Sequence, residues 1–163
     1  MDKFKEAFYQ AYVGEAKAAL RLKVYAQKAE DEGYSQIARL FRVIALSEEI
    51  HGSRSFRMLE DIKNTEENLA ASFESETHVA AVTYKEFLQM AMKEGKEREA
   101  KIFSQARDVE ETHAKLYKHA MDHMLEDREV TYRVCTVCGY VAEDQLPDKC
   151  PVCGVPKEKF KEF

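Results

Sequence analysis

The sequence predicts a mainly α-helical fold, a four-helix bundle followed by a small metal-binding module. No proline occurs between Phe4 and about Glu126, and glycine is rare there, which favours long helices. Apolar residues in that region recur at the three- and four-residue spacing of a buried helix face. All three prolines and all four cysteines follow Thr131. We therefore expect a bundle over residues 1–128 and a separate cysteine-rich domain over residues 129–163.

We place the four helices at about 3–31, 35–62, 66–94 and 97–126, with a turn signal between each pair. Gly33 and Gly95 mark the first and third turns, and Lys63-Asn64-Thr65 marks the second. Two glutamates follow Thr65, which suits the start of a helix. The clearest apolar stripes are Ile37, Phe41, Ile44, Met58 and Ile62 in the second helix, and Phe103, Ala106, Tyr117, Ala120 and Met124 in the fourth.

Charge and hydropathy exclude several classes of protein. The net charge is −5 and no basic cluster occurs, which argues against nucleic-acid binding. No apolar stretch has the length of a signal-peptide core or a membrane span. We therefore expect a cytoplasmic protein with neither nucleic acid nor membrane among its partners.

The helical region contains an internal repeat at an offset of 62 residues. Two helical hairpins of one ancestral type, related by approximate two-fold symmetry, explain it. The matching residues are Gln27, Ala29, Glu32, Gly33, Ala38, Phe41, Glu48, Glu49 and His51, repeated as Gln89, Ala91, Glu94, Gly95, Ala100, Phe103, Glu110, Glu111 and His113.

The repeat duplicates a pattern of metal-ligating residues. Glu48-x-x-His51 and Glu110-x-x-His113 each place a carboxylate and an imidazole one helical turn apart, in phase with the apolar stripe. Glu15 and Glu76 are in-phase acids on the other two helices. Four carboxylates in an apolar interior would each cost several kcal/mol unless paired, and no matching core Lys or Arg is present. Two divalent cations would compensate them, and this is the ligand set known from ferritin-like di-iron and di-manganese proteins.

Each part of this pattern has an ordinary explanation when taken alone. A single Glu-x-x-His on a helix is common, and a single in-phase glutamate more often lies on a solvated face. The combination in four helices favours a dinuclear site. His78, His119 and His123 have no partner at ligand spacing, so we expect surface or helix-capping roles for them.

The four cysteines form two Cys-x-x-Cys pairs, Cys135 with Cys138 and Cys150 with Cys153. In a reducing compartment this spacing indicates four thiolate ligands for one tetrahedral metal rather than disulfides. A glycine follows each pair and leaves backbone amides free to turn towards the sulfurs. A zinc ribbon needs the same spacing, so the pattern leaves zinc and iron open.

The whole chain resembles the rubrerythrin family in the order of its motifs. The matching features are Gly14-Glu15, the two Glu-x-x-His motifs, Glu76-Thr77 and a cysteine tail that looks like a shortened rubredoxin. The resemblance implies a di-iron centre beside Tyr84 and one further iron on the cysteines. The implied di-iron ligands are Glu15, Glu48, His51, Glu76, Glu110 and His113, and the implied ligands of the single iron are Cys135, Cys138, Cys150 and Cys153.

The resemblance also implies an activity, the reduction of hydrogen peroxide in oxidative-stress defence. Electrons would come through the thiolate-bound iron from an external donor such as rubredoxin or an NAD(P)H-dependent reductase. The alternatives are a dioxygen-reducing oxidase or ferroxidase, and a non-enzymatic metal-holding protein with a zinc ribbon. Manganese or zinc in the dinuclear site also stays open.

Two positions depart from the family pattern. Rubrerythrins usually carry a further glutamate three residues after the third-helix ligand, which exchanges with a histidine as the redox state changes, and this chain has Val79 there. Leu22 stands where a tyrosine is usual. If Val79 faces the metals, His51 is expected to stay bound in both redox states, as in the six-ligand pattern of bacterioferritin or manganese catalase.

Ligand spacing predicts a domain-swapped homodimer. Glu15 to Glu48 spans 33 residues and Glu76 to Glu110 spans 34, but Glu48 to Glu76 spans only 28. In the one-crossover bundle the second and third helices run parallel, so their link must climb about 30 Å at a helical rise of ~1.5 Å per residue. About seven linking residues reach only ~25 Å. We therefore expect the first hairpin of one chain to complete a bundle with the second hairpin of another.

The phase of the repeat predicts a local irregularity. At the offset of 62, Glu76 aligns with Gly14 rather than with Glu15, a slip of one residue. A π-bulge in the first or third helix would absorb this slip.

Overall fold

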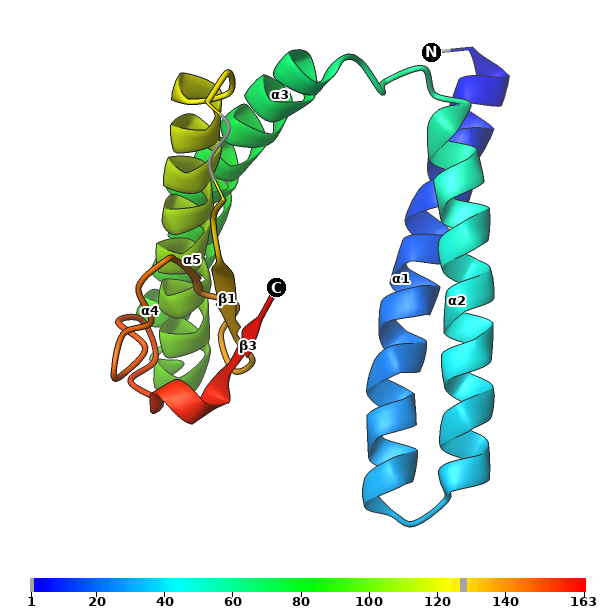
Figure 1. The fold of residues 1–163 in the computed structure, drawn as a ribbon. Helices are drawn as coiled ribbons and strands as arrows, with labels where there is room; N and C mark the ends of the chain where they lie inside the picture. The colour runs from blue at the N-terminus through cyan, green and yellow to red at the C-terminus, as the bar shows by residue number, and fades with distance from the viewer. Residues whose placement is uncertain (1, 127–128) are drawn as a thin grey trace. The chain divides into compact units, whose positions relative to one another are not determined.

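The computed structural model describes residues 2–126 and 129–163, and it divides after Lys63 into two compact units. The first unit is a pair of helices. The second contains a further helical hairpin and a small three-stranded sheet near the C-terminus (Figure 1). This content confirms the predicted fold class. Within the described part, no helix is long and apolar enough to cross a membrane.

The first unit is an antiparallel hairpin of α1 (Lys3–Asp31) and α2 (Ser35–Arg57). Gly33 turns the chain with φ +83°, and the amide of Tyr34 donates to the carbonyl oxygen of Ala29 at 2.8 Å. This six-to-one bond is the Schellman ending of a helix, and it requires the left-handed backbone that glycine adopts without strain. The predicted turn at Gly33 is therefore confirmed.

Small residues let the two helices of the first unit approach closely. The side chains buried between them are Ala19, Ala26, Ala29, Ala38, Ala45 and the position of Gly52. Larger rings lie at the edges of this seam, where Tyr12 packs on Phe56 with centroids 4.9 Å apart and Tyr25 packs edge-on to Phe41. The hairpin is thus held by close backbone approach rather than by large buried side chains.

Overpacking this seam is expected to destabilise the chain. Ala38 is 0% exposed, so Ala38→Leu would force the helices apart and cost about 1–3 kcal/mol in the free energy of unfolding. Chemical denaturation of the metal-free protein measures this cost. Ala16→Leu, at an exposed position of α1, is the matched control. Equal denaturation midpoints for the two variants would contradict the packing account.

The second unit begins with one long helical segment that changes its winding part-way along. It runs as α3 (Thr65–His78), a five-residue π-helix η1 (Val79–Thr83) and α4 (Tyr84–Lys93). The side chain of Asn64 caps α3 by accepting from the amide of Glu67 at 2.9 Å. In the π segment the amide of Tyr84 donates to the carbonyl oxygen of Val79, five residues back. The predicted π-bulge is confirmed, and it lies just after Glu76.

The fourth long helix is α5 (Glu97–Asp122), which packs antiparallel to α3 and α4. Gly95 has φ +67°, and the amide of Lys96 donates to the carbonyl oxygen of Ala91 at 2.9 Å. This turn repeats the Gly33 turn at the offset of 62. The sequence repeat therefore corresponds to two hairpins with the same kind of connection.

Two predicted helix ends are wrong. Helix α2 ends at Arg57 rather than 62, because the chain tightens into three-residue turns and Glu60 takes the left-handed conformation with φ 61°. Leu59 is buried by this turn, so its apolar side chain does not require a longer helix. Helix α5 ends at Asp122 rather than 126, and a turn closed by the Glu126 amide and the His123 carbonyl follows it.

The C-terminal module is a small antiparallel sheet with two cysteine loops. Its strands are β1 (Tyr132–Cys135), β2 (Val141–Glu143) and β3 (Phe160–Glu162), in the order β2-β1-β3, with a short 3₁₀ turn η2 (Lys157–Lys159) before β3. Ala142 pairs with Arg133, and Phe160 pairs with Cys135. The cysteine loops lie after β1 and before η2. Strand β2 packs against α5.

Candidate metal centres

The second unit brings three potential metal ligands together. Glu76 of α3 meets Glu110 and His113 of α5, and one ligand atom of each lies within 4.8 Å of the other two. Nδ1 of His113 is 3.0 Å from Oε2 of Glu110. All three side chains are half-buried. Burial, followed by the nearby carboxylate of Glu110, raises the pKa of Glu76 above its usual range.

The first unit holds an equivalent group. Glu15 of α1 meets Glu48 and His51 of α2, again within 4.8 Å, and Nδ1 of His51 is 3.2 Å from Oε2 of Glu48. Gly52 lies against this group, since a Cβ built there would be in van der Waals contact with Cβ of Glu15 at 3.4 Å. The six predicted ligands therefore form two groups of three with the same composition, one in each unit.

Each group suits a divalent cation. The two carboxylates of each group repel one another when both are ionised, and a metal ion at their focus would offset that repulsion while the imidazole supplies a nitrogen ligand. In both groups Nδ1 is the ring nitrogen that faces the carboxylate. A histidine that binds a metal through Nδ1 keeps Nε2 for a second hydrogen bond.

The other residues singled out from the sequence lie in or beside the π segment and on α1. Tyr84 is half-buried and packs against Phe87 and Phe103, with ring centroids 6.1 and 6.5 Å away. It is outside both ligand groups, so its role stays a prediction. Val79 and Leu22 are half-buried, Val79 at the start of η1 and Leu22 on α1.

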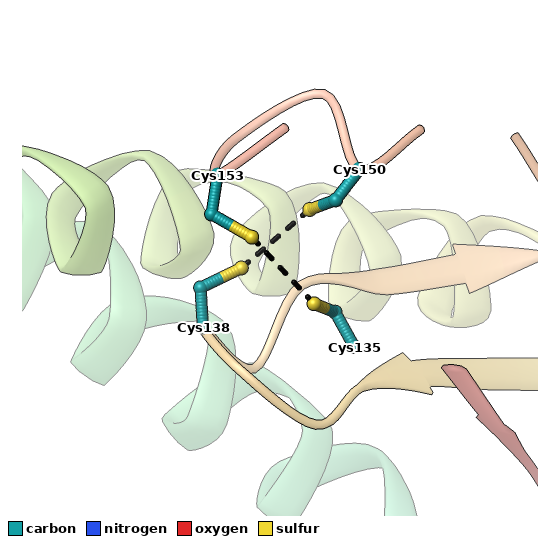
Figure 2. A group of neighbouring side chains, drawn as sticks. All are labelled: Cys135, Cys138, Cys150 and Cys153. Atoms are coloured by element: carbon teal, nitrogen blue, oxygen red, sulfur yellow. Dashed lines mark hydrogen bonds between the residues drawn. The ribbon is translucent and has the colours of Figure 1, made fainter. Parts of the chain in front are cut away.

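The four cysteines converge on one point, as Figure 2 shows. Sγ of Cys135 is 3.7 Å from Sγ of Cys153, and Sγ of Cys138 is 3.5 Å from Sγ of Cys150. These separations are too long for disulfides. They are close to the ~3.8 Å expected between thiolates bound tetrahedrally at ~2.3 Å from one metal.

Backbone amides support this convergence. In the first loop the amide of Gly139 donates to the carbonyl oxygen of Cys135, and in the second the amide of Gly154 donates to that of Cys150, both at 2.9 Å. Both glycines have positive φ, +85° and +77°, and the amides of Tyr140 and Val155, which follow them, donate to the sulfurs of Cys138 and Cys153.

The thiols differ in their ease of ionisation. Burial opposes ionisation of Cys135, but main-chain amides of Cys138 and Val137 donate to its sulfur, and the net result is a lowered pKa. Burial raises the pKa of Cys138 and of Cys153. A metal cation would overcome the burial penalty by replacing the thiol protons, so metal binding at this site releases protons.

One contact of the cysteine module was not foreseen from the sequence. The carbonyl oxygen of Gly139 lies 3.3 Å from Nε2 of His113, so the first cysteine loop touches a residue of the α3–α5 ligand group. A cavity of about 500 Å³ is lined by Glu76 and His113 together with Tyr132 and Val141 of the module. Sequence spacing carries no signal for this contact, because it depends on how the module packs.

The other histidines do not belong to metal groups among the described residues. His78 is exposed in the last turn of α3. Nδ1 of His123 is 2.8 Å from Oε1 of Glu126, near the end of α5 as expected. His119 has a role beyond the expected surface or capping one, because its Nδ1 lies 3.1 Å from Oε2 of Glu143 in β2.

Two family models match the chain. The rubrerythrin model matches residues 6–121, and the model of the rubrerythrin rubredoxin-like domain matches residues 134–161. The chain belongs to the rubrerythrin family. The first match contains both three-residue ligand groups, and the second contains all four cysteines.

The alignments with several named rubrerythrins and nigerythrins cover nearly the whole chain. Rubrerythrin-2 of Clostridium acetobutylicum is 32% identical over 170 residues, covering 94% of this chain and 92% of that protein. Rubrerythrin of Porphyromonas gingivalis is 32% identical over 180 residues, covering 98% and 90%. A solved structure of partially reduced nigerythrin aligns with a TM-score of 0.61 at 26% identity, covering 100% of this chain and 88% of that one.

These matches establish the cofactors at the level of the family. Rubrerythrin domains bind a di-iron centre, and their rubredoxin-like domains bind one iron through four cysteines. The carboxylate and histidine groups and the four converging thiols are donors that suit those irons. The chain is therefore a di-iron protein of this family with a rubredoxin-like domain.

Proposed function

We propose that the protein is a non-haem di-iron peroxidase that reduces hydrogen peroxide to water in the cytoplasm. Reduction of one peroxide to two waters consumes two electrons and two protons. The donor would be rubredoxin or an NAD(P)H-dependent reductase, with the rubredoxin-like iron as the relay. The observation that carries this proposal is the contact between the cysteine module and the α3–α5 ligand group, because it joins the two kinds of metal site within one unit.

In this proposal the six residues Glu15, Glu48, His51, Glu76, Glu110 and His113 hold the di-iron centre. The centre, when reduced, supplies the two electrons that break the O–O bond. The glutamates compensate the changing positive charge, and the histidines fix one nitrogen ligand in each half. Tyr84, by its match to a family tyrosine, lies beside the centre, where it hydrogen-bonds to the substrate or traps a stray oxidant.

We propose that the six ligands come together in a domain-swapped homodimer. The observed helix bounds support this, since α2 runs nine residues beyond Glu48 and α3 runs eleven residues before Glu76. At ~1.5 Å per residue, a link between parallel helices would have to climb about 30 Å. Residues 58–64 span at most ~25 Å when fully extended, and the tight turns at Met58 and Leu59 shorten them further.

The functional division follows from that assembly. Residues 1–128 would supply the di-iron bundle, with its two halves drawn from different chains, and residues 129–163 would supply the rubredoxin-like relay.

Val79 favours a second candidate, a dioxygen-reducing oxidase or ferroxidase. It replaces the carboxylate that exchanges on one iron in the usual family pattern, so His51 would stay bound in both redox states. A site with six fixed ligands then lacks the redox-linked ligand exchange that accompanies peroxide reduction in the family. The third candidate is a non-enzymatic metal-holding protein with zinc bound by the four cysteines.

One stopped-flow experiment distinguishes the three. The anaerobically reduced protein is mixed with stoichiometric peroxide or with air-saturated buffer, and the visible absorption of the thiolate-bound iron is followed. The peroxidase is expected to reoxidise at least about tenfold faster with peroxide. Faster reoxidation by dioxygen would favour the oxidase. Absence of a visible chromophore would indicate zinc and contradict the relay.

A further inference from the structure

The α1–α2 hairpin has an apolar face on the side away from its ligand group. Leu46 and Ile50 stand two residues before and two residues after Glu48, and two residues turn an α-helix by ~200°. Val13 stands in the same way two residues before Glu15. These side chains therefore point away from the ligands, and neighbours at three-, four- and seven-residue spacing extend the rows. The resulting outer face consists of Val13, Leu20 and Val24 on α1 and Val43, Leu46 and Ile50 on α2.

The outer face is strongly exposed. Five of its side chains are between 52% and 67% exposed, namely Leu20, Val24, Val43, Leu46 and Ile50. A contiguous apolar patch of this kind on a soluble protein usually marks an interaction site. In the bundle proposed above, the second hairpin would cover the opposite side, which carries the three ligands. The outer face would stay uncovered there, so it needs a partner of its own.

Charged residues continue both rows, and their sign differs between the two helices. On α1 the row reaches Glu6 at the open end of the hairpin and Asp31 at the turn end. On α2 it reaches Arg57 at the open end and Arg39 at the turn end. The carboxylates of Glu6 and Asp31 accept hydrogen bonds from glutamine side chains at 2.7 and 2.8 Å, bonds that add no positive charge. At each end of the face, α1 therefore offers an acid and α2 an arginine.

This charge pattern complements a second copy of the same face. Two copies related by two-fold symmetry can stack these faces with their helices aligned in two ways. With α1 on α2 of the other copy, like ends meet, and Glu6 faces Arg57 while Asp31 faces Arg39. With α1 on α1, the open end meets the turn end, so acid faces acid and arginine faces arginine. Like charges across an interface disfavour the second arrangement, so the charges select the first.

The face is also large enough for a stable contact. From Glu6 to Asp31 it is ~37 Å long, at ~1.5 Å per residue, and two helices with their side chains are ~20 Å across. Each copy thus offers ~700 Å², close to the ~800 Å² per partner of a standard interface. The ion pair of Lys23 with Glu49 joins α1 and α2 beside the apolar rows and adds no net charge. Lys17 shares the α1 row, and its apolar stem can pack along the face while its ammonium group stays in water.

We propose that the outer face is an interface with a second copy of this chain, in which α1 of each copy packs on α2 of the other. The exposed aliphatic side chains are buried at its centre, and ion pairs of Glu6 with Arg57 and of Asp31 with Arg39 close its ends. Both ligand groups face away from this contact, so it leaves the metal-binding sides of the two hairpins accessible. The inference does not depend on the activity of the protein.

Photo-cross-linking of the full-length, metal-loaded protein tests the contact. The photoreactive residue p-benzoylphenylalanine replaces Leu46, and covalent dimers are separated on a denaturing gel and mapped by mass spectrometry. We expect dimers whose cross-links reach α1 of the other copy between Leu20 and Val24. The same residue in place of Met92, an equally exposed side chain of α4, is the control and is expected to give no cross-link to the outer face. Absence of covalent dimers from position 46, or cross-links to α2 of the other copy, would overturn the inference.

A charge exchange tests the stacking independently. In the chain labelled at position 46, Arg39→Glu is expected to lower the yield of these cross-links at least about threefold, because it places two carboxylates opposite one another. Adding Asp31→Arg restores an opposite pair and is expected to bring the yield back to within about twofold of the unaltered charges. Arg98→Glu, the same change at an exposed position of α5, should leave the yield unchanged. An equal loss with Arg98→Glu, no loss with Arg39→Glu, or no recovery in the double variant would overturn the stacking.

Discussion

Two inactive variants are expected to restore a di-iron site when they form a dimer together. One chain carries Glu48→Ala and His51→Ala, and the other carries Glu110→Ala and His113→Ala. Each variant alone lacks one ligand group in every site, because the two groups lie in different units. In a swapped heterodimer one site collects both damaged groups and the other collects both intact groups. Iron bound at the di-iron sites is therefore expected at about half the level of the unaltered dimer, while the four-cysteine sites stay filled.

The measurement is iron content and peroxide turnover of heterodimers, purified through two different tags after co-expression. Homodimers of each variant, purified in the same way, should have empty or poorly loaded di-iron centres. The four-cysteine site is unaltered in both chains, so its visible absorption confirms folding. A heterodimer as inactive as the homodimers would show that each site takes all six ligands from one chain, and the swapped assembly would be wrong.

Val79→Glu is expected to shift the balance between peroxide and dioxygen. Val79 lies three residues after Glu76, at the first position of the π segment. A carboxylate there would supply the exchanging ligand of the usual family pattern and release His51 in one redox state. We expect the ratio of reoxidation rates, peroxide over dioxygen, to rise about tenfold, a difference of ~1.4 kcal/mol in the activation free energies.

Val82→Glu is the matched control, because Val82 lies in the same π segment and is exposed. It adds the same charge to the same segment on a more accessible side chain. An equal change of the ratio in both variants would indicate a general effect of charge, and no change in Val79→Glu would show that this position does not reach the metals.

The sequence predicted the helical hairpins well because their signals are local. The turns at Gly33 and Gly95 need a residue that adopts positive φ, and the repeat at the offset of 62 marked both. The π segment was also predictable, since a one-residue slip in ligand phase must be absorbed somewhere in the helix. The ends of α2 and α5 were not, because apolar residues such as Leu59 continue past the last helical hydrogen bond and are buried by a turn instead.

The sequence did not predict contacts between elements that are far apart in the chain. The ligand types and their spacing gave the composition of the three-residue groups in each unit, and the cysteine spacing gave the four-sulfur cluster. The hydrogen bond from His113 to Gly139 and the pair of His119 with Glu143 depend on how the module packs on α5. Neither residue pair has a spacing rule that could have revealed it.

The π segment also bears on how the two halves of the molecule diverged. Glu76 lies one residue further from its hairpin turn than Glu15 does, and η1 accommodates that extra residue between Glu76 and Tyr84. A duplicated hairpin followed by the insertion of a single codon accounts for this difference. The extra residue leaves Glu76 beside Glu110 and His113, and by Tyr84 the repeat is back in register, since Tyr84 matches Leu22 at the offset of 62. One extra residue thus separates two ligand groups of identical composition by the winding of the helix beside them.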